Sequence, residues 1–375
     1  MIGEAMSKKI RVGIIFGGKS AEHEVALQSA KNVIEAINKE KYEVVLIGID
    51  KTGKWHLQDK ARYLLNENDP KQIALDLSAA THVVSAPIEN HTELVTVETG
   101  QSHGAIDVVF PVLHGPFGED GTIQGMLKLL DLPFVGASVL GSSVGMDKDV
   151  AKRLLRDAGI PIARFQVFTR NNKHLVDFES IKQDLGLPLF VKPANLGSSV
   201  GIHKVKNEEE LNFAVNDAFK YDTKILIEEF IKGREIECAI LGNEAPKASI
   251  VGEVIPKHDF YSYEAKYIDE NGAQLEIPAK VTDETLGRVQ EIAIRTFTTL
   301  CCEGMARVDV FLTDDGKIYV NEINTIPGFT KISMYPKLWE LSGIKYTDLI
   351  DKLIQLAIER YQHEHELKVT YELTK

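Results

Sequence analysis

The sequence predicts an α/β protein of two or three domains, the first of which contains a doubly wound parallel sheet. The chain of 375 residues is long enough for two or three hydrophobic cores. Residues 9–16 and 42–50 are apolar runs separated by a helical stretch that ends near residue 38, which is typical of a strand–helix–strand unit. Residues 304–334 contain two alternating strands around an Asp-Gly turn, so a hairpin is expected near the C-terminal end.

The composition is that of an ordinary globular protein, and it argues against several classes of function. Apolar residues make up 44% of the chain, and the net charge of −12 without a basic run argues against a nucleic-acid binder. No apolar run approaches the roughly 18 residues of a membrane span, and the first residues lack the apolar core of a signal peptide. The three cysteines are too few for a disulfide framework, so a cytoplasmic location is expected.

The first strand leads into a glycine-rich turn. Its sequence matches the phosphate-loop pattern, but the position of the match relative to the strand does not fit a phosphate loop. Residues 13–20 fit the pattern G-x-x-x-x-G-K-S. In a phosphate loop the first glycine follows the strand, whereas most of this match lies inside the strand, so we expect no nucleotide triphosphate there. Glu24, early in the following helix, is either a surface carboxylate at the positive helix end or the partner of a substrate ammonium.

The next strand, residues 106–112, leads into the glycine-rich loop HGPFGEDGT, which begins with His114. Ligands of open α/β sheets bind in loops at the carboxyl ends of strands. A lone histidine in a loop is often incidental, so His114 either lines a site or has no part in it. Residues 132–139 close this unit, and the stretch rich in Gly and Ser after them is a domain boundary in this interpretation.

The middle of the chain contains two lysines and a loop that suit phosphate binding. Lys148 lies near the start of a helix over residues 147–157, and Lys192 ends the strand 189–192. The Gly/Ser loop that follows, residues 193–201, connects two strands. It either folds over phosphates with its N–H and O–H groups or is a hairpin turn.

Glu228 lies in the strand predicted for residues 224–230, and Glu235 begins the stretch 235–241 that follows it. Glu228 and Glu235 either hydrogen-bond an adenine amino group and a ribose or are solvated charges. Residues 260–267 (FYSYEAKY) are aromatic and charged, and they either form a lid or pack locally. The last helix, residues 348–361, has one apolar stripe and is expected to dock on the rest of the molecule.

The C-terminal hairpin carries a cluster of polar residues on one face. Side chains alternate along a strand, so Arg307 and Asp309 share a face, and so do Glu322 and Asn324. A two-residue loop places Asp309 opposite Glu322, whereas a register slipped by one pair places Arg307 opposite Glu322. Adjacent carboxylates repel each other, and a divalent cation with oxygen ligands offsets that repulsion. The alternative is a solvated face on which Arg307 pairs with a carboxylate.

The segment TIPGFT leaves the second strand at the end where Asn324 lies. Gly328 in this segment allows a backbone N–H to approach a ligand closely. A metal pair, an arginine and a free backbone donor together suit a reaction that moves phosphoryl charge and then develops an oxyanion.

Five stretches in this order resemble the D-alanine–D-alanine ligases of the ATP-grasp superfamily. They are HEVAL after GGKSAE, HGPFGEDG, FVKPANLGSSVG, YEAKY, and ARVDVF with NEINTIPGFTKIS, and the resemblance covers residues 8–366. It implies an ATP-grasp architecture with an N-terminal α/β domain (8–136), a central subdomain (137–228) and a C-terminal subdomain (229–368). It also implies ATP, two Mg²⁺ or Mn²⁺ sites, and a homodimer.

The resemblance assigns roles to the residues that match the family motifs, first for ATP and the metals. The implied phosphate contacts are Lys148, Lys192, Gly197, Ser198 and Ser199. The implied base and ribose contacts are Glu228, Glu235 and backbone groups at Glu229 and Ile231. The implied metal ligands are Asp309, Glu322 and Asn324.

The resemblance also implies three groups of residues around the amino-acid substrates. The first D-alanine would meet Glu24 and His114, the oxyanion would meet Arg307 and the Gly328 N–H, and the second carboxylate would meet Ser333 and Met334. Glu24, Ser198 and Tyr267 would form a hydrogen-bonded link that closes the lid, beside Lys266.

The implied reaction joins two D-alanines through a D-alanyl phosphate, for peptidoglycan synthesis. Tyr267 favours D-alanine as the second substrate, because ligases that make D-alanyl-D-lactate typically lack this tyrosine. Ala26 departs from the serine of many relatives and removes a hydroxyl near the first substrate. The alternatives are another ATP-grasp carboxylate–amine ligase, including one for D-lactate or D-serine, and a nucleotide-binding regulatory module without turnover.

Overall fold

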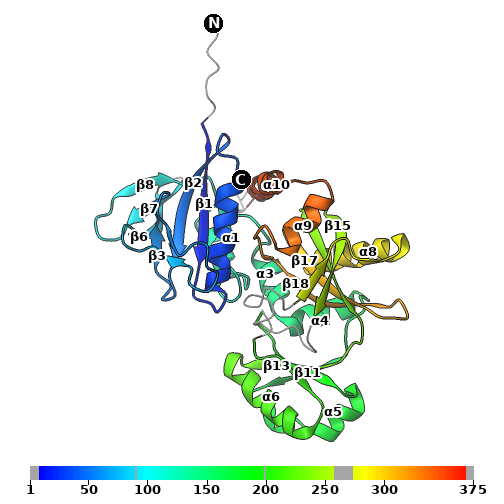
Figure 1. Cartoon of the computed structure of the whole chain (residues 1–375). Helices are drawn as coiled ribbons and strands as arrows, with labels where there is room; N and C mark the ends of the chain where they lie inside the picture. The colour runs from blue at the N-terminus through cyan, green and yellow to red at the C-terminus, as the bar shows by residue number, and fades with distance from the viewer. Residues whose placement is uncertain (1–7, 89–90, 198–199, 257–272, 369–375) are drawn as a thin grey trace, which may run out of the picture.

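The structure is a computed structural model that describes residues 8–88, 91–197, 200–256 and 273–368, and it contains three larger β-sheets (Figure 1). In the view of Figure 1 the N-terminal sheet lies at the upper left, the C-terminal sheet at the upper right and the central sheet below. Four residues to which the resemblance assigns roles lie outside the described residues: Ser198, Ser199, Lys266 and Tyr267. Within the described ranges, no helix is both long and apolar enough for a membrane span.

The N-terminal sheet has seven strands, and its parallel centre matches the doubly wound unit predicted from the sequence. β1 (Ile10–Gly17) lies between β2 (Tyr42–Ile49) and β9 (Val108–Val112), and both run parallel to it. Helix α1 (His23–Ala36) connects β1 to β2, and α2 (Thr122–Leu129) follows β9. The remaining strands are β3 (Trp55–Leu57), β6 (Thr81–Ile88), β7 (His91–Thr96) and β8 (Ser102–Ala105), with β4 (Leu64–Leu65) and β5 (Ala74–Leu75) as a separate pair.

The central sheet is antiparallel, with the strand order β10-β13-β11-β12. β11 (Leu189–Pro193) and β12 (His203–Val205) are antiparallel neighbours, which confirms that the Gly/Ser loop connects two strands. Helices α5 and α6 cover one face of the sheet, and α4 lies near its opposite side (Figure 1). The other elements are α3 (Val139–Met146), α4 (Lys148–Asp157), β10 (Phe165–Thr169), a 3₁₀ turn (Lys173–Leu175), α5 (Phe178–Leu185), α6 (Glu208–Tyr221) and β13 (Lys224–Glu229).

The C-terminal sheet has five strands in the order β16-β15-β14-β17-β18, and helices cover both of its faces. Side chains of β14 alternate between two cores: Ile236 and Cys238 pack on the side of α8, whereas Ala239 and Leu241 pack on the side of α9 and α10. The elements are β14 (Arg234–Gly242), β15 (Lys247–Pro256), β16 (Ala273–Glu276), α8 (Asp283–Thr299), β17 (Gly304–Leu312), β18 (Ile318–Asn324), α9 (Met334–Leu341) and α10 (Tyr346–His365).

The last helix joins the first and third sheets through one hydrophobic core. Leu349, Ile350 and Leu353 of α10 are buried in the same cluster as Val12 and Leu27 of the N-terminal part. This confirms the docking role predicted from the apolar stripe of the helix. Because the core is shared, loops from the two ends of the chain are held in a fixed relation.

The C-terminal hairpin has the first of the two registers considered from the sequence. Asp309 of β17 lies opposite Glu322 of β18, and Arg307 lies opposite Asn324. The four polar side chains therefore share one face of the sheet. The slipped register, with Arg307 opposite Glu322, is excluded.

The loop of this hairpin is longer than the two-residue turn considered from the sequence. Thr313 N donates to Lys317 O at 2.9 Å, so three residues form the loop, and Gly316 among them has a φ of 76°, which favours glycine. A bulge at Asn321 then adds one residue to β18 between the loop and the polar face. The extra loop residue and the bulge compensate for each other, and this restores the expected pairing at the carboxylates.

Candidate active site

Charged side chains from four elements meet where the central sheet approaches the C-terminal hairpin. Lys148, at the start of α4, has its Nζ 3.5 Å from Glu322 Oε2 in β18. Lys192 of β11 has its Nζ 2.8 Å from Glu228 Oε2 in β13 and donates to Asn321 Oδ1 at 3.4 Å. The structure thus brings together the predicted phosphate lysines, one predicted base contact and one predicted metal ligand.

Glu228 is a buried carboxylate with a lysine at each of its two oxygens. Lys192 Nζ meets Oε2, and the Nζ of Lys152 lies 3.3 Å from Oε1. Burial alone would raise the pKa of Glu228, but the two lysines outweigh it and lower that pKa to about 2. Glu228 is therefore an ionised hydrogen-bond acceptor in the interior, not the solvated charge of the alternative interpretation.

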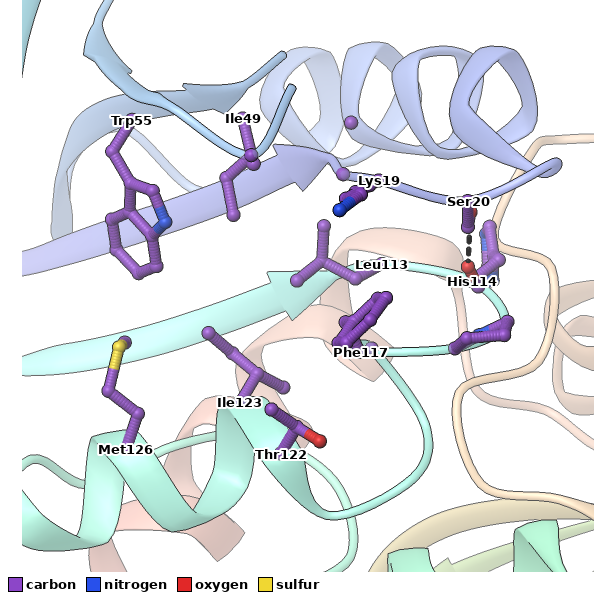
Figure 2. A pocket seen from close by; sticks show the side chains of 15 residues that line it. Lys19, Ser20, Ile49, Trp55, Leu113, His114, Phe117, Thr122, Ile123 and Met126 are labelled. Atoms are coloured by element: carbon purple, nitrogen blue, oxygen red, sulfur yellow. Dashed lines mark hydrogen bonds between the residues drawn. The ribbon is translucent and has the colours of Figure 1, made fainter. Parts of the chain in front are cut away.

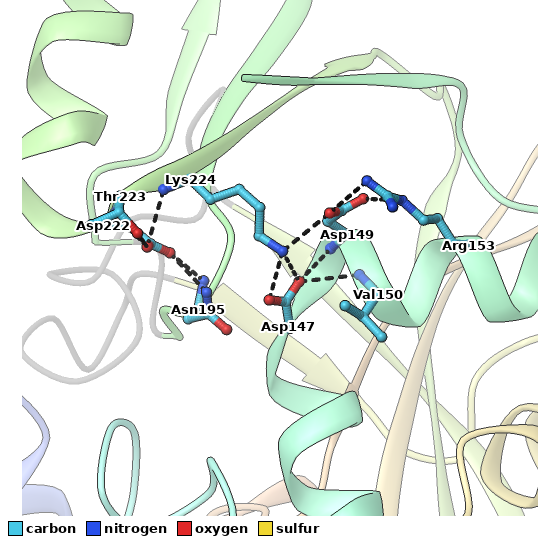
Figure 3. A network of polar contacts seen from close by, with 8 residues as sticks. All are labelled: Asp147, Asp149, Val150, Arg153, Asn195, Asp222, Thr223 and Lys224. Atoms are coloured by element: carbon cyan, nitrogen blue, oxygen red, sulfur yellow. Dashed lines mark hydrogen bonds and ion pairs between the residues drawn. The ribbon is translucent and has the colours of Figure 1, made fainter. Parts of the chain in front are cut away.

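A polar network holds the start of α4 against the central sheet (Figure 3). Asp147 caps the helix by accepting from the N–H groups of Asp149 and Val150 at 3.1 Å. Lys224, the first residue of β13, has its Nζ 2.7 Å from Asp147 and 3.1 Å from Asp149, and Arg153 pairs with Asp149 as well. The network positions the helix face on which Lys148 and Lys152 lie.

We expect Lys224→Met to destabilise the protein by about 1–3 kcal/mol, because two partly buried carboxylates lose their shared cation. The measurement is the midpoint of thermal unfolding, which should fall. Lys220→Met is the control, since the side chain of Lys220 is 69% exposed and pairs with Asp217 within one helix. This change should cost less than about 0.5 kcal/mol. Equal midpoints for the two variants would show that the network does not stabilise α4.

The loop after β11 is anchored at its start. Asn195 donates from its backbone and side-chain nitrogens to Asp222 Oδ2 at 2.8 and 3.1 Å. Lys148 Nζ donates to Leu196 O at 2.7 Å. Gly197, the last described residue of this part of the loop, therefore lies next to Lys148, one of the two lysines predicted to contact phosphates.

Arg307 lies between two carboxylates on adjacent strands. Its Nε and Nη2 each donate to an oxygen of Asp309 at 2.7 Å, and Glu237 of β14, opposite Asp309, has Oε2 2.9 Å from Nε. Asn324 Nδ2 also donates to Asp309 at 3.0 Å. These carboxylates outweigh burial and raise the pKa of Arg307, so its guanidinium is a fixed, permanent cation.

The oxygen ligands of the hairpin suit a hard divalent cation. Asp309 and Glu322 are opposite each other, and Asn324 shares their face. Asp309 pairs with Arg307, as in the alternative interpretation of this face. Glu322 lies beside Lys148 and is the second carboxylate of the hairpin. The donor set therefore fits Mg²⁺ or Mn²⁺, which prefer carboxylate and carbonyl oxygens.

His114 is buried and links the N-terminal part to the TIPGFT segment. Its Nδ1 is 3.0 Å from Ile326 O, and its Nε2 is 3.1 Å from Ser29 Oγ of α1. Burial lowers the pKa of His114, which favours a neutral ring that donates to Ile326 and accepts from Ser29. Ser29 Oγ in turn accepts from Phe329 N at 3.3 Å, so this chain of hydrogen bonds fixes the backbone on both sides of Gly328.

Two acids that the sequence did not single out lie beside His114. Glu119 Oε1 accepts from Ile326 N at 3.1 Å, and Oε2 accepts from Gly115 N at 2.8 Å. Burial and the neighbouring charge of Glu22 raise the pKa of Glu119. The positions of both carboxylates therefore match a binding site for a cationic group such as an ammonium.

Glu24, predicted either as the ammonium partner or as a surface carboxylate, pairs with an exposed lysine. Its carboxylate forms an ion pair with Lys51 at 2.5 Å, and its side chain is 30% exposed. Glu22, two residues earlier, is buried, and its Oε2 lies 2.5 Å from where a Cβ on Gly115 would be and 3.5 Å from where a Cβ on Gly197 would be. Glu22 therefore reaches both glycine loops of the site.

A cavity of about 260 Å³ lies at the carboxyl ends of β1, β2 and β9 (Figure 2). Apolar side chains such as Trp55, Leu113 and Met126 line most of it, and Ser20 donates to His114 O at its edge. Its lining includes His114 but none of the lysines or carboxylates of the hairpin site. Gly13, the first glycine of the phosphate-loop pattern, lies inside β1, which confirms that the pattern is not a phosphate loop.

The remaining predicted residues lie in or beside β13, β14 and α9. Glu229 pairs with Arg164, and Ile231 lies in the connection between β13 and β14. Glu235 lies near the start of β14. Ser333 precedes α9 and accepts from Thr330 N at 3.0 Å, and Met334 is the buried first residue of that helix.

Lys152, Glu22, Glu119 and Ser29 are residues of the site that the sequence analysis missed. A signal existed for Lys152, since it follows Lys148 by four positions and so shares its helix face. The glycine-rich loops indicated the places of Glu22 and Glu119 but not which acid faces inward. No local pattern marks Ser29, whose partners are 85 and 300 residues away in sequence.

Two family models match the two parts of the chain. Residues 11–137 match the family model described as D-ala D-ala ligase N-terminus, and residues 154–355 match the one described as D-ala D-ala ligase C-terminus. The D-alanine--D-alanine ligase of Oceanobacillus iheyensis is 57% identical over 360 residues, which are 96% of this chain and 98% of that protein.

Two solved structures are similar over nearly the whole chain. The D-alanine-D-alanine ligase from Coxiella burnetii has a TM-score of 0.83 at 39% identity, covering 96% of this chain and 97% of the other. The VanG D-Ala:D-Ser ligase from Enterococcus faecalis has a TM-score of 0.83 at 37% identity, covering 93% of this chain and all of the other (100%).

Proposed function

The chain belongs to the D-alanine–D-alanine ligase family, and we propose that it joins two D-alanines to D-alanyl-D-alanine with ATP through a D-alanyl phosphate. The observation that carries this proposal is Arg307, a fixed cation on the same sheet face as the carboxylates Asp309 and Glu322. Lys148 of α4 and Lys192 of β11 contact the same hairpin, at Glu322 and Asn321. The lysines can neutralise charge on a transferred phosphoryl group, and Arg307 can stabilise an oxyanion at the same site.

ATP binds, in this proposal, between the central sheet and the hairpin. Lys148 and Lys192 contact its phosphates, together with the N–H of Gly197. Glu228 accepts from the amino group of adenine, and Glu235 accepts from the ribose. Backbone groups at Glu229 and Ile231, in the connection between the sheets, complete the base site.

A divalent cation, Mg²⁺ or Mn²⁺, would be held by Asp309, Glu322 and Asn324, and it would neutralise negative charge on the phosphoryl group. Residues of the chain position the substrates for the two bond-forming steps. The first D-alanine carboxylate attacks the γ-phosphorus of ATP while Lys148 and Lys192 hold the phosphates in place. The bond from that phosphorus to the β–γ bridging oxygen breaks, so ADP leaves and a D-alanyl phosphate forms. The amine of the second D-alanine then attacks the acyl phosphate, and inorganic phosphate leaves.

The amino-acid site lies on the side of His114. We assign the ammonium of the first D-alanine to Glu22, because its carboxylate is buried beside Gly115 and Gly197. Arg307 and the N–H of Gly328 stabilise the oxyanion, and the hydrogen bonds around Ile326 and Phe329 hold that N–H in place. Ser333 and the backbone of Met334 receive the carboxylate of the second D-alanine.

The experiment that tests this function measures phosphate release from ATP and Mg²⁺ with D-alanine, beside L-alanine, D-lactate and D-serine. We expect release that requires D-alanine, with the dipeptide identified by mass. Faster release when D-serine accompanies D-alanine would indicate the activity named for the similar VanG ligase. No release with any of them, from folded protein that binds ATP, would overturn the proposed substrates.

We expect Glu322→Gln to raise the Mg²⁺ concentration for half-maximal activity by about 10–100-fold or more, because a carboxylate ligand is lost. A titration of activity with Mg²⁺ after chelation measures this. Glu340→Gln, an exposed change on α9, is the control and should leave the titration unchanged. An unchanged titration for Glu322→Gln would remove this residue from the metal site.

We also propose a cytoplasmic homodimer. Leu129 of α2 and Leu140 of α3 are exposed, at 89% and 59%, on two helices that contact each other. Light scattering should give twice the chain mass of 41.7 kDa. A concentration-independent mass of one chain would contradict the dimer.

A further inference from the structure

Lys152 is a buried lysine to which the proposed mechanism gives no task. It lies one helical turn after Lys148, and its side chain is 3% exposed. Burying an ammonium is costly unless a partner compensates, so such a residue needs a reason to be there. Its nearest charged partner is Glu228 Oε1, at 3.3 Å.

The contact between Lys152 and Glu228 leaves hydrogen-bonding capacity unused. Within the described residues, neither Lys152 Nζ nor Glu228 Oε1 has a hydrogen bond of normal geometry, although both atoms are buried. The other oxygen of the carboxylate has a good bond to Lys192, at 2.8 Å. Glu228 Oε1 is therefore a buried acceptor that matches a ligand N–H, with the ammonium of Lys152 beside it.

We propose that Lys152 is a positioning residue for nucleotide selection, which holds the carboxylate of Glu228 toward the amino group of an adenine and frees Lys192 for the phosphates. The proposal rests on the proposed function, which places the nucleotide at Glu228. Adenine offers an amino N–H beside ring nitrogens with lone pairs, whereas hypoxanthine has a carbonyl oxygen in place of the amino group. A fixed carboxylate accepts from the first and repels the second.

The charges around Glu228 explain why two lysines are needed. If Lys192 were the sole partner of this carboxylate, its ammonium would be drawn away from a phosphate. Lys152 is too deeply buried to reach solvent-exposed phosphates, and the ring of Phe165 lies 5.9 Å from its Nζ. Burial lowers the pKa of Lys152, and the neighbouring carboxylate of Glu228 opposes that shift.

The test compares Lys152→Met with Lys152→Arg in the full chain, with ADP and IDP as calorimetric ligands. We expect Lys152→Met to raise the Kd for ADP by about 10-fold or more and to reduce the preference for ADP over IDP by about 5-fold or more. Lys152→Arg, which keeps the charge, should recover most of that preference. Arg156→Met, an exposed cation on the same helix, is the matched control and should change neither value.

Two results would overturn the proposal. One is an unchanged ADP preference in folded Lys152→Met. The other is an equal loss of both affinities with a lowered unfolding temperature, which would mean a structural role only. Because binding is measured without turnover, a protein that lacks ligase activity but loses ADP preference in Lys152→Met would overturn the proposed reaction and support the role of Lys152.

Discussion

Arg307→Ala is expected to lower kcat by about 10²–10³-fold while changing the Kd for ATP by less than about threefold. The guanidinium is fixed by two hydrogen bonds to Asp309 and a close contact with Glu237, so it is in place before any charge develops. In the part of the chain that the structure describes, its ion pairs are with Glu237 and Asp309, and not with Lys192 or Glu228, the groups proposed for the nucleotide. Steady-state rates with D-alanine and calorimetry with a non-hydrolysable ATP analogue measure the two quantities separately.

The control for Arg307 addresses the carboxylates that lose their partner. Removing one member of a buried ion pair typically costs about 3–5 kcal/mol of stability. Arg307→Ala combined with Glu237→Gln removes one of the two uncompensated charges, so it should recover part of the unfolding temperature without recovering kcat. If the double variant regained activity with stability, or if kcat and ATP binding fell equally in the single variant, the oxyanion role would be wrong.

Glu22→Gln is expected to lower kcat/KM for D-alanine by about 10²-fold, since a buried charge pair with the substrate ammonium would be lost. Glu24→Gln should change it by less than about threefold, because the carboxylate of Glu24 pairs with Lys51. The two substitutions are chemically identical and only two positions apart, so they isolate the direction in which each carboxylate points. Initial rates over a range of D-alanine concentrations measure both.

The outcome for this pair separates the two assignments cleanly. A large loss in Glu24→Gln with little change in Glu22→Gln would support Glu24, the residue implied by the family resemblance, as the ammonium partner. The same result would reject Glu22. Saturation with ATP should be unaffected in both variants. A similar rise in the KM for ATP would mean that the helix start had moved, not that an ammonium partner had been lost.

Several features follow from local sequence alone. The parallel centre of the N-terminal sheet was predicted because β1, α1 and β2 each carry a hydrophobic pattern of the right length. The pairing of Asp309 with Glu322 was one of two registers considered from the sequence, because strand alternation and a nearby turn leave few choices, and the structure has this one. The family motifs indicated the ATP-grasp fold and the ligase activity, because five of them occur in the right order.

Tertiary structure decided the features that depend on distant residues. The hairpin loop and the bulge at Asn321 each differ from the simplest expectation, and only their combination yields the predicted pairing. In the helix that starts at His23, both Glu22 and Glu24 suit the positive end, and only packing against the loop of Gly115 shows which one is buried.

The sequence by itself determined the fold class, the hairpin and the kinds of residue that carry the chemistry, since turn chemistry and side-chain periodicity act over a few positions. Only the tertiary structure placed Lys152 at Glu228 and joined His114 to Ile326, which is 212 residues away. The physical reason is that burial and hydrogen-bond partners are set by contacts between segments far apart in the chain. No window of local sequence contains that information.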